Sequence, residues 1–96
     1  MATVDVAFKN IAPSGQIARS GFSTNQTFTS SASSQATTAG ANANEYAQIV
    51  VSGGNIRYTV AATPTAVADG TCELVLDGER IEVDVPTGHK VAIIDA

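Results

Sequence analysis

The chain contains 96 residues, carries a formal net charge of −4 at pH 7, and is 44% hydrophobic but only 5% aromatic. This length fits one folded domain and excludes a second hydrophobic core. Scattered basic residues and the lack of an aromatic series argue against nucleic-acid binding. The start of the chain has neither a basic region nor an apolar stretch, and no run of about 18 apolar residues occurs, so we expect no export signal and no membrane partner.

The first half of the chain holds one clear strand and one weakly specified segment. The predicted first strand has apolar residues at every second position: Val4, Val6 and Phe8. Residues 20–44 are dominated by Ser, Thr, Ala, Gly and Asn. We expect extended strands here, anchored by Phe22 and Phe28, with an edge strand at 35–38. A disordered linker is the alternative, because such a composition buries little apolar surface.

Residues 46–95 are predicted to hold five strands. They are residues 46–51, which include the apolar run 49–51, the alternating segments 55–61, 72–76 and 80–85, and a final strand at 90–94. A period of two identifies the side chains expected to face the core: Ile56, Tyr58 and Val60; Cys72, Leu74 and Leu76; and Ile81, Val83 and Val85.

Turn-forming residues separate these strands. Gly53-Gly54 follows the apolar run, and residues 86–88 precede the last strand. Asp77-Gly78 suits both central positions of a type I′ turn, so we expect a tight hairpin that makes 72–76 and 80–85 antiparallel neighbours.

The spacing of the strands predicts the fold class. Short strands about 8 to 12 residues apart, separated by Gly, Pro and Asp, are typical of sandwiches and small barrels. We therefore expect an all-β fold, a small antiparallel β-sandwich that is Ig-like or jelly-roll-like. Residues 1–96 would form this single domain, with the weakly specified segment at 20–44.

Two isolated side chains, His89 and Cys72, are of types that can act in a chemical site. His89 follows a turn and has neither an orienting partner nor a nucleophile motif nearby, so we interpret it as a solvent-facing turn residue. Cys72 cannot form an internal disulfide, which is compatible with a reducing cytoplasm, and we expect it to pack as a small hydrophobe with an inert thiol. No catalytic residue is predicted, and the chain is not expected to be an enzyme.

Other patterns suggest sites but lack the required spacing. The acidic residues Glu73, Glu79, Glu82 and Asp84 are expected to gather on the outward face of the hairpin as a solvated surface, since no calcium-loop pattern accompanies them. Gly53-Gly54 lacks the spacing of a phosphate loop. Tyr46 and Tyr58 could form a sugar-stacking platform, but core or interface roles are favoured. We predict no metal and no cofactor.

The order of motifs from Glu45 to the end, together with the Ser/Thr/Ala-rich stretch before it, resembles small bacteriophage virion proteins of the capsid-decoration or head-surface type. The motifs are SSQATT (33–38), YAQIVV (46–51), NIRYTV (55–60), AATPTA (61–66), the predicted hairpin 74–85 and PTGHKVAII (86–94). The resemblance implies a non-catalytic β-sandwich that stabilises or coats the head, in a virion assembled in the host cytoplasm. It implies the major capsid protein or neighbouring virion subunits as partners, and a homo-oligomer, with a trimer as the first guess.

This functional interpretation leaves alternatives open. A neck, tail or fibre subunit has the same requirements, and a carbohydrate-binding or cell-surface module would depend on Tyr46 or Tyr58. A decoration subunit could use an extended arm that adds a strand to a neighbour's sheet. Residues 3–8 are one candidate arm, and residues 20–44 are the other, ordered only when laid against a capsid or a sister subunit.

Overall fold

The computed structural model describes residues 1–10 and 24–96, and within them it contains eight β-strands. The strands are β1 (Thr3–Asn10), β2 (Thr24–Thr29), β3 (Gln35–Ala36), β4 (Glu45–Ser52), β5 (Ile56–Ala61), β6 (Glu73–Val75), β7 (Arg80–Asp84) and β8 (Lys90–Asp95). No helix in the described ranges is long and apolar enough to cross a membrane. The five strands predicted in the second half and the edge strand near residue 35 are confirmed, while Phe22 lies outside the described residues.

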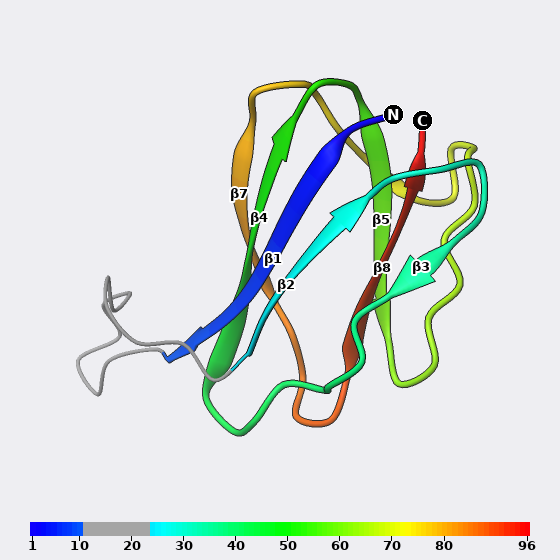
Figure 1. Cartoon of the computed structure of the whole chain (residues 1–96). Coiled ribbons are helices and arrows are strands. Elements are labelled where there is room, and N and C mark those ends of the chain that lie inside the picture. Colours follow the sequence, from blue (N-terminus) through cyan, green and yellow to red (C-terminus); the bar gives the residue numbers. More distant parts are fainter. Residues whose placement is uncertain (11–23) are drawn as a thin grey trace.

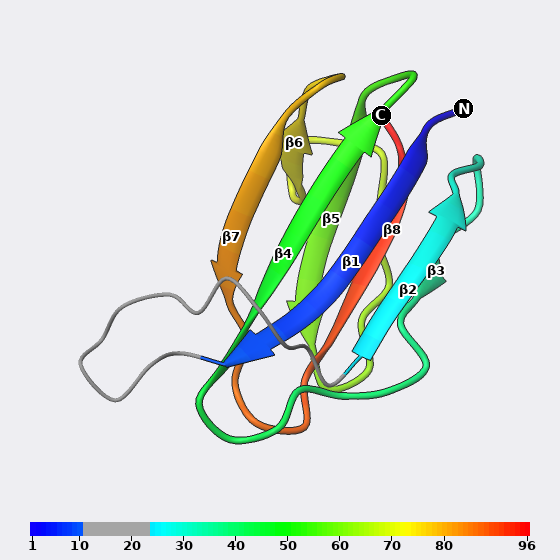
Figure 2. The ribbon, with the colours of Figure 1, turned by 60° about the vertical axis from the view of Figure 1, so that its left-hand side comes forward.

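In the described part of the chain, the strands form two four-stranded antiparallel sheets. The first sheet has the order β2-β1-β4-β7, and the second has the order β3-β8-β5-β6. The two sheets face each other across a shared core (Figure 1, Figure 2). This arrangement confirms the predicted small β-sandwich.

The strand order is that of a jelly roll with one strand moved along the chain. Lettered in chain order, the sheets of a jelly roll run B-I-D-G and C-H-E-F. When the lettering starts at β2, both sheets are reproduced, and β1 takes the place of the last strand, I. Every connection except β1–β2 and β5–β6 passes from one sheet to the other, so the chain wraps around its core. Of the two predicted forms, the topology is therefore jelly-roll-like rather than Ig-like.

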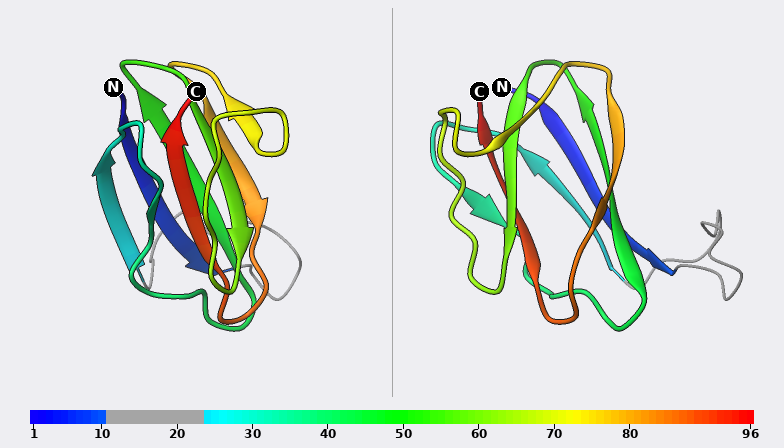
Figure 3. Two further views of the ribbon diagram at one scale, coloured as in Figure 1. Left: turned by 90° about the vertical axis from the view of Figure 1, so that its right-hand side faces the viewer. Right: turned by 180° about the vertical axis from the view of Figure 1, so that it is seen from behind.

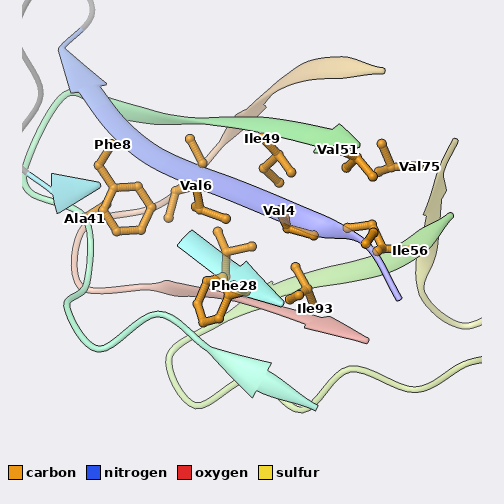
Figure 4. Close-up of a cluster of buried hydrophobic side chains, with 14 residues drawn as sticks. Val4, Val6, Phe8, Phe28, Ala41, Ile49, Val51, Ile56, Val75 and Ile93 are labelled. Carbon is orange, nitrogen blue, oxygen red and sulfur yellow. The ribbon is translucent and has the colours of Figure 1, made fainter. Parts of the chain in front are cut away.

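The core lies between the inner faces of β1, β4, β5 and β8, with Phe28 added from β2 (Figure 4). Val4 and Val6 of β1 lie opposite Val51 and Ile49 of β4, and all four are at most 1% exposed. Fully burying such a side chain stabilises the fold by about 1.5–3 kcal/mol. The inward alternation predicted for the first strand is confirmed.

One buried hydroxyl joins the two ends of the sandwich. The Ser30 Oγ, which is fully buried, accepts a hydrogen bond from the Ala2 amide at 2.7 Å and donates one to the Asp95 carboxylate. The Ser30 amide also donates to the Ala2 carbonyl at 2.8 Å. Ser30 therefore fixes the start of β1 beside the end of β8, and the two termini lie next to each other in Figure 1.

The loop of residues 62–72, called here the outer loop, covers the outer face of the second sheet (Figure 3, left). Ala66 packs there with Ala92 and Ile94 of β8. The Ala66 amide donates to the Ser34 Oγ at 2.8 Å, which ties the loop to the far edge of the sheet. This cover explains why β8 is apolar on both faces, a pattern expected for a strand buried on both sides.

Three sequence expectations are wrong at the level of strand geometry. In β6, Val75 is 1% exposed and faces the core, whereas Leu74 and Leu76 are 46% and 49% exposed, so the inward phase is opposite to the prediction. Leu74 pairs with Arg57 of β5 on the outer face.

The second error concerns the predicted arm at residues 3–8. These residues are not an arm, because β1 pairs with β2 on one side and β4 on the other.

The predicted Asp77-Gly78 hairpin is the third error. The turn exists, since the Glu79 amide donates to the Leu76 carbonyl at 3.1 Å, but it leads from the second sheet to the first. Only Gly78 has positive φ, at 85°, as a type II turn requires. Gly78 and Glu79 both bond to Val51, which forms a β-bulge where β7 begins. A type II turn followed by a bulge replaces the predicted type I′ turn, and β6 and β7 do not pair.

Candidate interaction surface

The sandwich has two lateral sides, and hydrogen bonds close one of them. On the side of β2 and β3, the Gln35 side-chain amide donates to the Thr29 carbonyl at 2.8 Å. On the same side, the Thr38 amide donates to the Gln26 Oε1 at 2.9 Å. These contacts join the edges of the two sheets.

The opposite side, between β6 and β7, leaves apolar side chains half-buried. β6 is short and pairs with β5 only at residues 56–58, so the end of β5 has no edge strand beside it. The half-buried residues that pack against the core here are Tyr58, Val60, Ile81 and Val83. We call these four residues the open side. Figure 2 shows β6 and β7 together at this side of the molecule.

The outer edge of β7 carries unused backbone groups. The Val51 amide donates to the Glu79 carbonyl at 3.0 Å. Because antiparallel strands alternate which residues bond to a given neighbour, Ile81 and Val83 direct their N–H and C=O groups to β4. The groups of Arg80, Glu82 and Asp84 then point away from the sheet, and no other described residue bonds to them.

The side chains on the outer face of β7 are charged. Arg80, Glu82 and Asp84 are exposed, and the Arg80 Nε lies 3.8 Å from the Glu82 Oε2. Such an exposed ion pair contributes little to stability. Charges along an edge strand do restrict which strands can pair with it, so β7 offers hydrogen bonds to a partner of suitable charge.

The four acidic residues predicted to lie together are exposed, but they do not share one face. Glu73 belongs to β6 in the second sheet, whereas Glu82 and Asp84 belong to β7 in the first. The Glu79 carboxylate accepts a hydrogen bond from the Leu76 amide at 2.6 Å in the turn. The prediction of a common face fails because β6 and β7 are not a hairpin. In residues 1–10 and 24–96, no three potential ligands gather that could hold a metal ion.

His89 is half-buried rather than solvent-facing. Its turn packs against residues 40–41: the Ala41 amide donates to the His89 carbonyl at 2.9 Å, and the Gly88 amide donates to the Ala41 carbonyl at 2.8 Å. A Cβ at Gly40 would lie 2.7 Å from the Gly88 carbonyl oxygen. The His89 Nδ1 is buried and has no hydrogen-bond partner within the described residues.

Cys72 is buried as predicted, at 8% exposure, but outside the main core. It closes the outer loop, where its Sγ accepts a hydrogen bond from the Val67 amide at 3.3 Å. The Arg57 guanidinium donates to the Cys72 carbonyl at 2.9 Å and holds this end of the loop against β5. Cys72 therefore serves to position the loop.

The two tyrosines do not form a joint platform. Tyr46 lies on the outer face of the first sheet, where it is 4% exposed, and Tyr58 lies on the inner face of the second. Burial raises the pKa of the Tyr46 phenol, Glu82 raises it further, and Arg80 acts in the opposite direction. Burial and then Glu73 raise the pKa of Tyr58. The pKa of both phenols is therefore higher than that of an ordinary tyrosine.

The sequence alone does not predict the open side. Its members were predicted correctly as inward-facing, and the charged alternation of β7 was visible. What the sequence did not reveal is that β6 is too short to cover β5 and that β7 is an edge strand.

Compared with known proteins, the chain matches no family model, no curated protein and no solved structure.

Proposed function

We propose that this protein is a non-catalytic structural subunit of a bacteriophage particle, most specifically a decoration or cement protein on the head. The observation that carries the proposal is the open side, where half-buried apolar residues lie beside a strand edge with unused hydrogen-bonding groups. Such a surface suits contact with a neighbouring protein subunit, through strand addition and apolar burial together.

The fold and the motif resemblance support the same assignment. Jelly rolls are common in viral capsid proteins, although a fold alone does not determine a function. A coat protein binds in many copies, so individually modest contacts combine into stable attachment. The open side, with its four half-buried residues, suits such a modest contact, and we propose the major capsid protein or neighbouring virion subunits as its partners.

The experiment is co-sedimentation of the purified protein with capsids of the phage that encodes it. We expect the protein to pellet with capsids, and Val83→Thr to reduce the bound amount, because a hydroxyl in the open side weakens the contact with the neighbouring subunit there and attachment in many copies depends on such contacts. Val50→Thr is the matched control, since Val50 is 38% exposed on the outer face of β4. Wild-type protein that stays in the supernatant, or equal binding by both variants, would contradict the proposal. Binding to tails alone would move the protein to another part of the particle.

A further inference from the structure

We propose that the neighbour bound by the open side is a second copy of this chain, which pairs β7 with β7 in antiparallel orientation about a two-fold axis at Glu82. This inference rests on the proposed structural role and names the partner of the same surface. The pairing would join two four-stranded sheets into one continuous sheet. Its interface is isologous, as two-fold contacts are.

The free backbone groups determine the register. Those of Arg80, Glu82 and Asp84 point away from β4. With the axis at Glu82, Glu82 lies opposite Glu82 of the second copy, and Arg80 lies opposite Asp84. All the outward N–H and C=O groups of β7 then bond across the interface. An axis at Ile81 would leave those of Asp84 unpaired.

The charges favour this arrangement for two copies. Arg80 and Asp84 are exposed at opposite ends of β7, so the antiparallel pairing places each beside its opposite charge twice. Directly opposed opposite charges stabilise strand pairs, and like charges destabilise them. An axis at Val83 would place Glu82 opposite Asp84, which is repulsive. At Glu82 the two like charges face each other, and each has Arg80 of the other copy on one diagonal and Asp84 on the other, so the two opposed Arg80–Asp84 pairs carry the preference.

The apolar side chains also fit. Ile81 and Val83 are half-buried and face the core. In the same register, Ile81 lies opposite Val83 of the second copy on the inner face. Each copy therefore extends the other's apolar layer at the place where β6 is too short to cover it, and removing this surface from water favours association.

The test measures association in solution by sedimentation equilibrium, without capsids. We expect wild-type protein to form a dimer and both Arg80→Asp and Asp84→Arg to raise the dissociation constant about tenfold or more, because each change acts twice across the axis. Mixing the two variants should restore association, since each then meets its opposite charge, and the double variant should dimerise alone. Lys90→Asp, which changes the net charge equally on the second sheet, should leave the dimer intact.

Three results would overturn the inference. They are a wild-type monomer at the highest soluble concentration, a trimer as first guessed from the motif resemblance, and single variants that do not complement each other on mixing. Rescue by Arg80→Glu with Glu82→Arg in one chain would instead place the axis at Ile81 and refute the register. Capsid binding is assayed separately. A dimer that does not bind capsids would contradict only the proposed function, and a monomer that binds capsids would contradict only this inference.

Discussion

Ser30 is a small residue, yet its side chain connects the start of β1 with the end of β8. Its hydroxyl is fully buried and bonded to both the Ala2 amide and the Asp95 carboxylate, which come from opposite ends of the chain. A serine in a Ser-rich segment usually lies at the surface. Here the Ser30 hydroxyl joins β1 and β8, which belong to different sheets and therefore do not pair through their backbones.

Replacing Ser30 with alanine should lower the free energy of unfolding by about 1–3 kcal/mol, because it leaves the buried Ala2 amide and the Asp95 carboxylate without this partner. Urea denaturation followed by circular dichroism measures the change. Ser33→Ala, at an exposed position in the same segment, should stay within about 0.5 kcal/mol of wild type. Equal effects of the two substitutions would show that the Ser30 contacts do not stabilise the fold.

The direction in which residues face was predictable where a strand is long and central. The alternation at Val4, Val6 and Phe8 is correct because β1 has a neighbour on each side and one buried face. It failed in β6, where apolar residues occupy both phases and the strand is only three residues long. Val75 rather than Leu74 faces the core, because pairing with β5 and the outer loop position the strand. Local alternation in the sequence carries no information about either contact.

At the scale of elements, the turn before β7 determines how the open side is built. Gly78 adopts positive φ and opens the β-bulge opposite Val51. The turn is tied to the β4–β5 turn as well, because the Gly53 amide donates to the Asp77 carboxylate at 2.8 Å and the Asp77 amide donates to the Asn55 Oδ1 at 2.9 Å. The bulge thereby fixes which residues of β7 point their backbone groups outward.

Gly78→Ala should lower the free energy of unfolding by about 1–2 kcal/mol, since a Cβ is disfavoured at a φ of 85°. Nothing lies within 4 Å of a Cβ at this position, so the cost comes from the backbone alone. Gly70→Ala is the matched control, being equally open but without positive φ, and should change stability by less than about 0.5 kcal/mol. Thermal denaturation of the two variants that gave the same midpoint would contradict this account of the turn.

Elements were easier to predict than their neighbours. Turn residues and alternation located the strands of the second half, because both signals are local. Asp77-Gly78 marked the right turn, yet pairing was wrong, since a turn between antiparallel strands looks alike whether it stays in one sheet or crosses to the other. The candidate surface depends on this same information about which strands lie at edges, and so it could be found only from the structure.

The whole molecule is organised by a jelly-roll order in which β1 stands in for the final strand. The substitution is feasible because the start of β1 and the end of β8 are adjacent, held by Ser30 (Figure 1). The burial of a side chain depends on where its strand lies in space, so the same core can form whichever strand comes first in the sequence. Sequence order and spatial order are therefore separable in this fold.

A circular permutant should fold to the same structure. Joining the two termini with a short flexible linker and opening the chain within residues 11–23 would leave intact the strand pairs formed by residues 1–10 and 24–96, including β1–β2. We expect a cooperative unfolding transition and an unchanged far-ultraviolet circular dichroism spectrum. A permutant with the same linker but opened inside β4, between Ile49 and Val50, should not fold, because it divides a central strand. Failure of the first permutant would show that the β1–β2 connection is needed for folding.

The adjacency of the two ends also determines how the molecule responds to mechanical tension. A pull between Ala2 and Asp95 would draw β1 and β8 out of different sheets from the same end of the sandwich. The force would then act on the hydrogen bonds of each strand one after another rather than on all of them together, so the domain would unfold at low force. Load carried across the sheets, through their lateral edges, would not act on this weak direction.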